Sequence, residues 1–127
     1  MPRSICKAAV GAALLALAVP AAGHAEEIEV GTVAICDTQQ QAERVGALMH
    51  GDAQVALKAV NAQEHPGACG LANVAYIPGA SLSTIRTPDE TFEIAPILVL
   101  GIVNETGMQG VAPNVYFMVR KIDERVA

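Results

Sequence analysis

Two cysteines, Cys36 and Cys69, bracket the stretch with the clearest helical pattern in this chain, and β-like sequence lies on both sides of that stretch. The segment from Ile28 to Cys36 is rich in β-branched residues, as strands are. If the two sulfur atoms join, the helical segment is fastened to the strands that flank it. This constraint predicts a sheet with a helical insertion tied down at its base.

The first 25 residues follow the plan of a signal peptide. Arg3 and Lys7 supply a positive start, Ala8 to Val19 is apolar and uncharged, and small residues frame the end of the segment at Gly23 and Ala25. The apolar run is shorter than the roughly 20 residues that cross a bilayer. We therefore expect a leader of residues 1–25, cleaved after Ala25 with Gly23 as the alternative site. A single domain of residues 26–127 would then reside in the periplasm or be secreted, with no integral membrane segment.

Removal of such a leader takes Cys6 away and leaves an even pair of cysteines. In an oxidising compartment this pattern indicates a disulfide between Cys36 and Cys69. The closed loop would hold about 34 residues and contribute about 3–4 kcal/mol by the chain-entropy estimate. The alternatives are a metal pair or a catalytic thiol, but the chain has no Cys-x-x-Cys spacing and no histidines at fixed offsets.

The expected mature chain is acidic. Residues 26–127 contain 13 Asp and Glu against 6 Lys and Arg, a formal charge of −7. Such a field repels phosphate backbones and anionic lipids, so we expect no nucleic-acid partner.

The helical stretch carries its own start and stop signals. Thr38 followed by Gln41 has the spacing of a capping box, and one apolar stripe follows at helical intervals: Ala42, Val45, Leu48 and Met49. Gly51 ends this helix, and Asp52 can cap a second helix over residues 53–63, whose buried side is Ala56, Leu57 and Val60. The short glycine link predicts a helical hairpin, with one bent helix as the alternative.

After Cys69 the hydrophobic period changes to two, which predicts four more strands: Leu71 to Ile77, Leu82 to Thr87, Phe92 to Val103 and Asn114 to Asp123. Pro78-Gly79 fits the centre of a type II turn, with positive φ at the glycine. Pro96 cannot donate a ladder hydrogen bond, so a bulge or break is expected there. Short turns between strands favour an antiparallel meander.

The predicted fold class is therefore α+β. An antiparallel sheet of about five strands carries a helical hairpin after the first strand, and the helices cover one face. Proline and glycine positions allow the sheet to curl toward a partial barrel.

No catalytic or cofactor motif is apparent. Cys36, Asp37, His50 and His65 could form a nucleophilic arrangement, but a helix C-terminus for His50 and a turn before proline for His65 explain the two histidines better. Ser81 and Ser83 lack the second glycine of a nucleophile elbow. The acidic groups lack a calcium-loop pattern and are expected at a solvated rim: Asp89, Glu90 and Glu93, and Asp123 with Glu124.

Tyr116 and Arg120 fall on one face of the last strand, beside Met118. If the helices cover the other face, these side chains form an exposed aromatic–arginine patch of the kind enriched at protein interfaces. The alternative, which we favour, is that Tyr116 packs in the core and Arg120 is an ordinary surface charge. The pair is kept as the candidate partner-binding site.

Several stretches resemble a group of small exported two-cysteine proteins of Gram-negative bacteria: Ile35 to Val45, Ala59 to Ala62, Ala68 to Gly70 and Ile97 to Val103. The resemblance implies an exported single domain with two cysteines. It supplies no catalytic residues.

These observations favour a small exported binding module that acts without catalysis and without a cofactor, on a protein or small-molecule partner in the cell envelope. One alternative is an inhibitor of a hydrolase that presents a loop at residues 77–83 or 104–110. The other is a small hydrolytic enzyme that uses Cys36 or the acidic residues.

Overall fold

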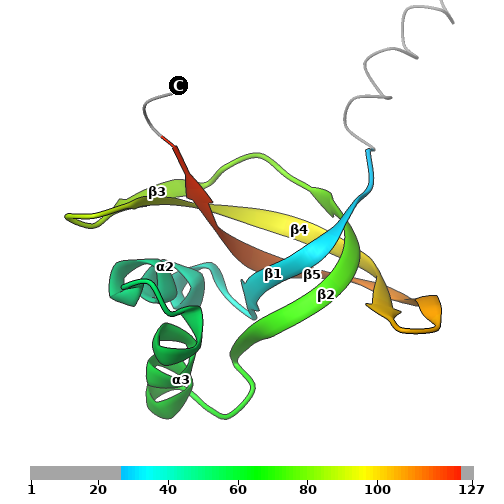
Figure 1. Ribbon diagram of the computed structural model, residues 1–127, viewed down its shortest axis with the longest axis horizontal. Helices are drawn as coiled ribbons and strands as arrows, with labels where there is room; N and C mark the ends of the chain where they lie inside the picture. The colour runs from blue at the N-terminus through cyan, green and yellow to red at the C-terminus, as the bar shows by residue number, and fades with distance from the viewer. Residues whose placement is uncertain (1–26, 124–127) are drawn as a thin grey trace, which may run out of the picture.

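The computed structural model describes residues 27–123, so the predicted signal peptide and its cleavage site lie outside the described residues. The elements in chain order are β1 (Glu29–Cys36), α2 (Gln39–Leu48), α3 (Ala53–Gln63), β2 (Cys69–Pro78), β3 (Ser83–Arg86), β4 (Thr91–Asn104) and β5 (Gly107–Ile122) (Figure 1). The predicted α+β class, with a helical hairpin after the first strand, is confirmed. Within residues 27–123, neither helix is long and apolar enough to cross a bilayer.

The five strands form one antiparallel sheet in the order β2-β1-β5-β4-β3, and β2 also pairs with β4. This extra pairing closes β1, β2, β4 and β5 into a ring, with β3 outside it on the edge of β4 (Figure 1). The predicted meander holds only for β3, β4 and β5. β2 does not lie beside β3, as a meander requires, because all eight residues of β1 pair with it, from Glu29 opposite Tyr76 to Cys36 opposite Cys69.

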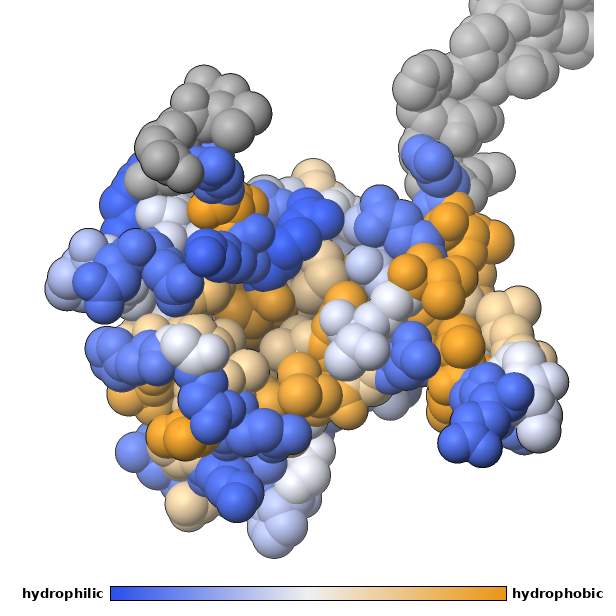
Figure 2. Space-filling model, in the orientation of Figure 1, coloured by the Kyte–Doolittle hydropathy of each residue, from blue (hydrophilic) through white to orange (hydrophobic). Residues whose placement is uncertain are grey.

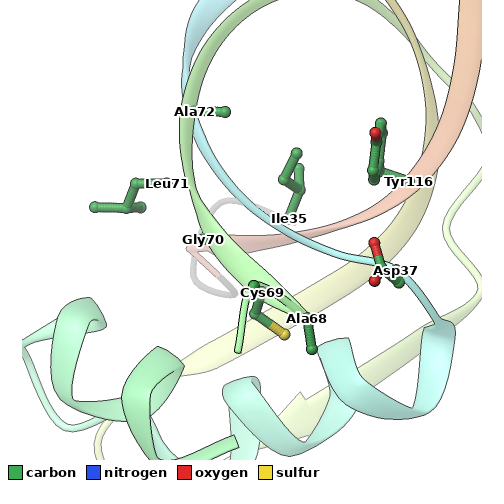
Figure 3. Close-up of a pocket in the computed structure, with 9 residues that line it drawn as sticks. Ile35, Asp37, Ala68, Cys69, Gly70, Leu71, Ala72 and Tyr116 are labelled. Carbon is green, nitrogen blue, oxygen red and sulfur yellow. The ribbon is translucent and has the colours of Figure 1, made fainter. Parts of the chain in front are cut away.

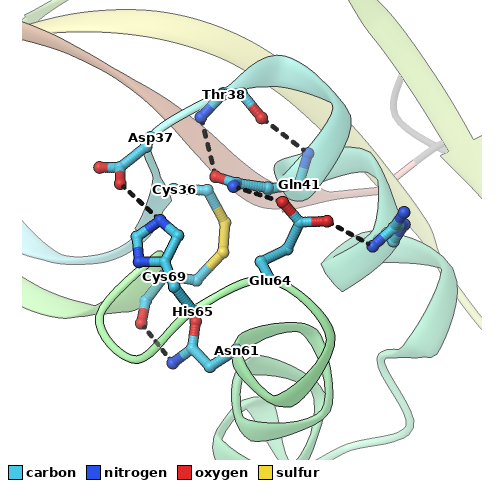
Figure 4. Close-up of a disulfide and its surroundings, with 9 residues drawn as sticks. Cys36, Asp37, Thr38, Gln41, Asn61, Glu64, His65 and Cys69 are labelled. Atoms are coloured by element: carbon cyan, nitrogen blue, oxygen red, sulfur yellow. Dashed lines mark hydrogen bonds and ion pairs between the residues drawn. A yellow bond between two sulfur atoms is a disulfide. The ribbon is translucent and has the colours of Figure 1, made fainter.

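The predicted disulfide joins the last residue of β1 to the first residue of β2. Cys36 and Cys69 lie directly opposite each other in the ladder and are bonded through their sulfur atoms. The amide of Asp37 donates to the carbonyl of Ala68 at 3.0 Å, which extends the pairing by one step. The chain leaves the sheet after Cys36 to form α2 and rejoins it at Cys69 after α3, so the cross-link closes the base of the helical insertion (Figure 4).

A polar network fixes the two helices to each other and to the cross-link (Figure 4). The capping box is confirmed: the Gln41 amide donates to the Thr38 hydroxyl, and the Gln41 side chain accepts from the Thr38 amide. Gln41 also donates to Glu64 at 3.1 Å, and Arg44 pairs with the same carboxylate at 3.1 Å. The hydrogen bond from Gln41, followed by the charge of Arg44, lowers the pKa of Glu64.

Asn61 of α3 makes a two-way contact with the backbone of Cys69. Its side-chain oxygen accepts from the Cys69 amide at 2.8 Å, and its side-chain nitrogen donates to the Cys69 carbonyl at 3.0 Å. The start of β2 is thereby held by a helix as well as by the disulfide.

The helices pack on one face of the sheet and bury the larger core. This core combines the predicted helix residues Ala42, Val45, Met49, Ala56, Leu57 and Val60 with sheet residues that include Phe92, Ile94 and Val119. Leu48 was predicted to be buried but is 40% exposed. At 3.6 residues per turn, Leu48 lies roughly 90° from the centre of the stripe formed by the buried residues.

The prediction of a positive-φ turn at Pro78-Gly79 is wrong, and the predicted bulge or break at Pro96 is found only as a break on one side of β4. Gly79 is not in the positive-φ region; its amide donates to the Pro96 carbonyl at 2.8 Å, and a Cβ on Gly79 would meet Pro96 Cγ at 2.9 Å. Glycine is therefore needed here for close approach. Pro96 pairs in register with Phe117 and causes no bulge. It lies between the part of β4 that pairs with β3 and the part that pairs with β2, so its missing N–H faces a gap in the ladder.

The irregularity of the β4–β5 ladder lies further along, between Val99 and Gly101. Val99 pairs with Asn114 and Gly101 pairs with Gly110, so three residues of β5 oppose one residue of β4. Pro113 is one of those three, in a position where a ladder donor is not required. The bulge explains why sequence reasoning began this strand at Asn114 and missed its first half.

Replacement of both Cys36 and Cys69 by alanine is expected to lower the free energy of unfolding by about 3 kcal/mol, because the cross-link restricts the unfolded chain. Urea denaturation of the oxidised native protein and of the double variant measures the difference. As a control, a reducing agent should shift the native midpoint and leave that of the double variant unchanged. Equal midpoints for the two oxidised proteins would contradict the structural role of the disulfide.

Candidate binding site

The side chains that point away from the helices face the inside of the ring. Side chains alternate along a strand, so Phe117 and Val119 of β5 contact the helix-covered core while Tyr116 and Met118 face the other way. A second hydrophobic cluster forms there, with Val74, Tyr76, Ile97, Val99 and Met118 at its centre. The fold therefore has one core under the helices and another within the ring.

One end of the ring interior is hollow. A pocket of about 460 Å³ is lined by apolar side chains from all four strands of the ring: Ile35, Ala72, Val74, Val99, Ile102 and Val111. Its size and apolar lining fit a site for a small molecule. The pocket lies where the β5 bulge replaces regular pairing and where Ala72 and Ala112 present only methyl groups.

Two neutral polar side chains, Asn114 and Tyr116, complete the lining. The Asn114 amide nitrogen donates to the Tyr116 hydroxyl at 3.4 Å, and the Asn114 oxygen accepts from the Val115 amide at 2.9 Å. The Tyr116 hydroxyl keeps its own proton to donate. An uncharged ligand group could accept this hydrogen bond.

A second hollow, of about 260 Å³, adjoins the first and shares Ile35, Ala72 and Tyr116 with it. Figure 3 shows these three side chains within the space enclosed by the strands, with Asp37 beside Tyr116 at the rim. Cys69 of the disulfide also lines this hollow. The site thus extends from the ring interior to the first residue after β1.

The rim of the pocket is partly apolar. Ile102 lines the pocket and is 48% exposed. Figure 2 shows further apolar surface on the side of the molecule where β1 begins, and Ile28 and Val30 are exposed there. Exposed apolar patches of this kind often accompany binding sites.

Beyond the buried Met118, polar side chains occupy another part of the ring's interior face. The Tyr76 hydroxyl donates to Glu29 at 3.2 Å, and Arg120 pairs with Glu93, which lies directly opposite it in the ladder. Burial, followed by the charge of Glu29, raises the pKa of Tyr76 above its ordinary value of 10. These contacts keep polar atoms paired beside the cluster.

The candidate partner-binding residues Tyr116 and Arg120 share the face predicted from their spacing, but the ring curls that face inward. Tyr116 lines the pocket, whereas Arg120 lies beyond the buried Met118 and is paired with Glu93. The structure therefore places them at different parts of the ring interior.

The candidate nucleophilic group is partly assembled (Figure 4). His65 Nε2 lies 3.7 Å from the Asp37 carboxylate, while His50 is exposed after the end of α2. Cys36 is bonded to Cys69 and is 1% exposed. A sulfur atom in a disulfide is not a thiolate, which is the nucleophilic form of cysteine.

The remaining candidates lie in surface contacts. Ser83 donates to Glu43 at 2.8 Å, and Glu90 pairs with Lys121 at 3.0 Å. Ser81 and Asp89 are exposed. Glu124 lies outside the described residues.

Sequence reasoning missed most residues of the pocket, since strands far apart in the chain supply them. Two signals were present. Ala72 places a small side chain on the face of β2 that also carries Val74 and Tyr76, and the Gly110 to Pro113 segment interrupts the β pattern at the bulge.

Tyr76 should ionise at a higher pH than an ordinary tyrosine. In the variant Tyr116→Phe, Tyr76 is the sole tyrosine left, and we expect the midpoint of its phenolate absorbance to lie above pH 10 because burial and Glu29 disfavour the charge. Since the unfolded chain ionises first, the contribution of Tyr76 to stability is complete below about pH 10 and is lost as the pH rises further.

The added change Glu29→Gln should lower that midpoint. A midpoint near 10 that is insensitive to Glu29→Gln would show that the Tyr76 hydroxyl is not held as described.

No protein-family model, no curated protein and no solved structure matches this chain. The resemblance to exported two-cysteine proteins thus stays a prediction, and the geometry of the site is what bears on function.

Proposed function

We propose that this protein is an exported binding module that holds a small, mainly apolar molecule inside its ring of strands and carries out no chemistry on it. The observation that carries the proposal is the apolar pocket of about 460 Å³ between β1, β2, β4 and β5. Pockets of roughly 300–1,000 Å³ with few polar groups are the usual form of small-molecule sites.

The hydrophobic effect supplies the affinity in this proposal. Each 100 Å² of apolar ligand surface removed from water is worth about 2.5 kcal/mol. Tyr116 and Asn114 then orient the ligand through one or two hydrogen bonds. Loss of translational freedom on binding offsets part of this gain, so micromolar affinity is the expected range.

A binding role is supported over catalysis by the chemistry beside the pocket. The polar groups that line it are a neutral amide and a neutral phenol. The candidate nucleophile Cys36 is bonded to Cys69 in the disulfide and has no free thiol. Export is supported by the signal-peptide pattern of residues 1–25 together with that disulfide.

The test is titration of the purified domain with Nile red, an uncharged dye whose fluorescence rises in apolar surroundings. We expect saturable binding by the native protein and at least a tenfold loss in Ala72→Trp, because the indole fills the pocket. The matched control Ala62→Trp changes an exposed residue of α3 outside the pocket lining and should bind as the native protein does.

Ala112→Trp blocks the same pocket from β5 and serves where Ala72→Trp fails to fold. Absence of saturable binding by the native protein would refute the proposal. So would dye binding that neither pocket variant weakens.

A further inference from the structure

The two adjoining hollows have different chemical character. The larger one is apolar, with Asn114 and Tyr116 as its polar members. The smaller one runs along the start of β2 and reaches the carboxylate of Asp37. Since they share Ile35, Ala72 and Tyr116, a ligand with its body in the first can place one end group in the second.

Asp37 is the one charged side chain among the described residues that line these two hollows. No lysine or arginine of residues 27–123 lines either of them. The field at the end of the site is therefore negative, on a chain whose formal net charge is −5. A positive end group is attracted there and a negative one is repelled.

The Asp37 carboxylate retains capacity to accept hydrogen bonds. Its ion-pair partner, His65 Nε2, is 3.7 Å away, which exceeds a hydrogen-bond length. The side chain is 45% exposed, so a ligand can reach it. An ionised carboxylate offers about four lone-pair sites, and an ammonium group has three donors to match.

We infer that the ligand class is an amphiphilic amine: an aliphatic or aromatic body occupies the ring pocket, and a protonated amine binds Asp37. This inference rests on the proposed function and adds the chemistry of the ligand's end group. An apolar acid of the same size would bring its carboxylate against Asp37, and an apolar alcohol would gain only a neutral hydrogen bond.

The test compares three molecules with the same ten-carbon chain, decylamine, decanol and decanoate, as competitors of Nile red at neutral pH and below their aggregation concentrations. We expect decylamine to displace the dye at the lowest concentration and decanoate at the highest. The preference for the amine over the alcohol should be about tenfold, the size of one charge-assisted hydrogen bond at a half-exposed site.

The decisive variant is Asp37→Asn, which keeps the shape of the side chain and removes its charge. We expect this variant to bind Nile red as before and to lose its preference for decylamine over decanol. The matched control Asp89→Asn removes one negative charge from an exposed turn outside both hollows, and it should keep the preference.

The outcomes separate the two claims. Suppose that Nile red binds the native protein and not Ala72→Trp, but that decylamine and decanol displace it equally well. This result would overturn the inference and leave the proposed function standing. Equal effects of Asp37→Asn and Asp89→Asn would also overturn it, because the preference would then follow net charge. Failure of Nile red to bind at all would refute both.

Discussion

The covalent bond between Cys36 and Cys69 determines how the rest of the chain is arranged. It joins the end of β1 to the start of β2 in register, where all eight residues of β1 pair with β2, so β2 runs back along β1 and does not take the place beside β3 that its position in the chain suggests. Once β2 is held there, its far half meets β4 and the ring closes. The helices between the two cysteines are confined to one side of the sheet, where Asn61 and the Gln41–Glu64 contact hold them.

Ring closure lets the four strands of the ring contribute side chains to a hydrophobic cluster on each of their two faces. An antiparallel sheet covered by helices on one side commonly leaves the other side to water. Here the alternation along β5 sends Val119 toward the helices and Met118 into the ring, and both are buried. A chain with few aromatic residues can thus bury aliphatic side chains in two places, and the second place, surrounded by the strands of the ring, contains the pocket.

Local signals in the sequence were sufficient for the elements and insufficient for their arrangement. The capping pair Thr38 and Gln41 and the buried side of α3 depend on neighbours within one or two turns, and these predictions are confirmed. The roles of Gly79 and Pro96 depend on each other across 17 residues of chain. Reasoning about each alone gave a type II turn that does not exist, and it could not tell that the interruption at Pro96 is a change of partner strand and not a bulge. The disulfide was predictable because the signal-peptide pattern and the even number of cysteines after residue 25 can be recognised without knowledge of the geometry. The pocket was not, since ring closure had to be known before Ile35 and Val99 could be placed together.

One part of the ring interior is filled by side chains and another part is open, and this difference bears on why the pocket exists. Around Ile97 and Met118 the ring interior is filled, and these residues are 1% exposed. Around Ala72 and Ala112 the same strands carry methyl groups, and the space between them stays open. Larger aliphatic side chains there would bury more surface and add stability, so selection for stability alone would fill the space. In the proposed function, a molecule that occupied this space would contribute the missing contacts, and by binding only the folded chain it would shift the folding equilibrium in proportion to its affinity and concentration. Under that proposal, binding at the open end of the ring adds directly to the stability of the fold.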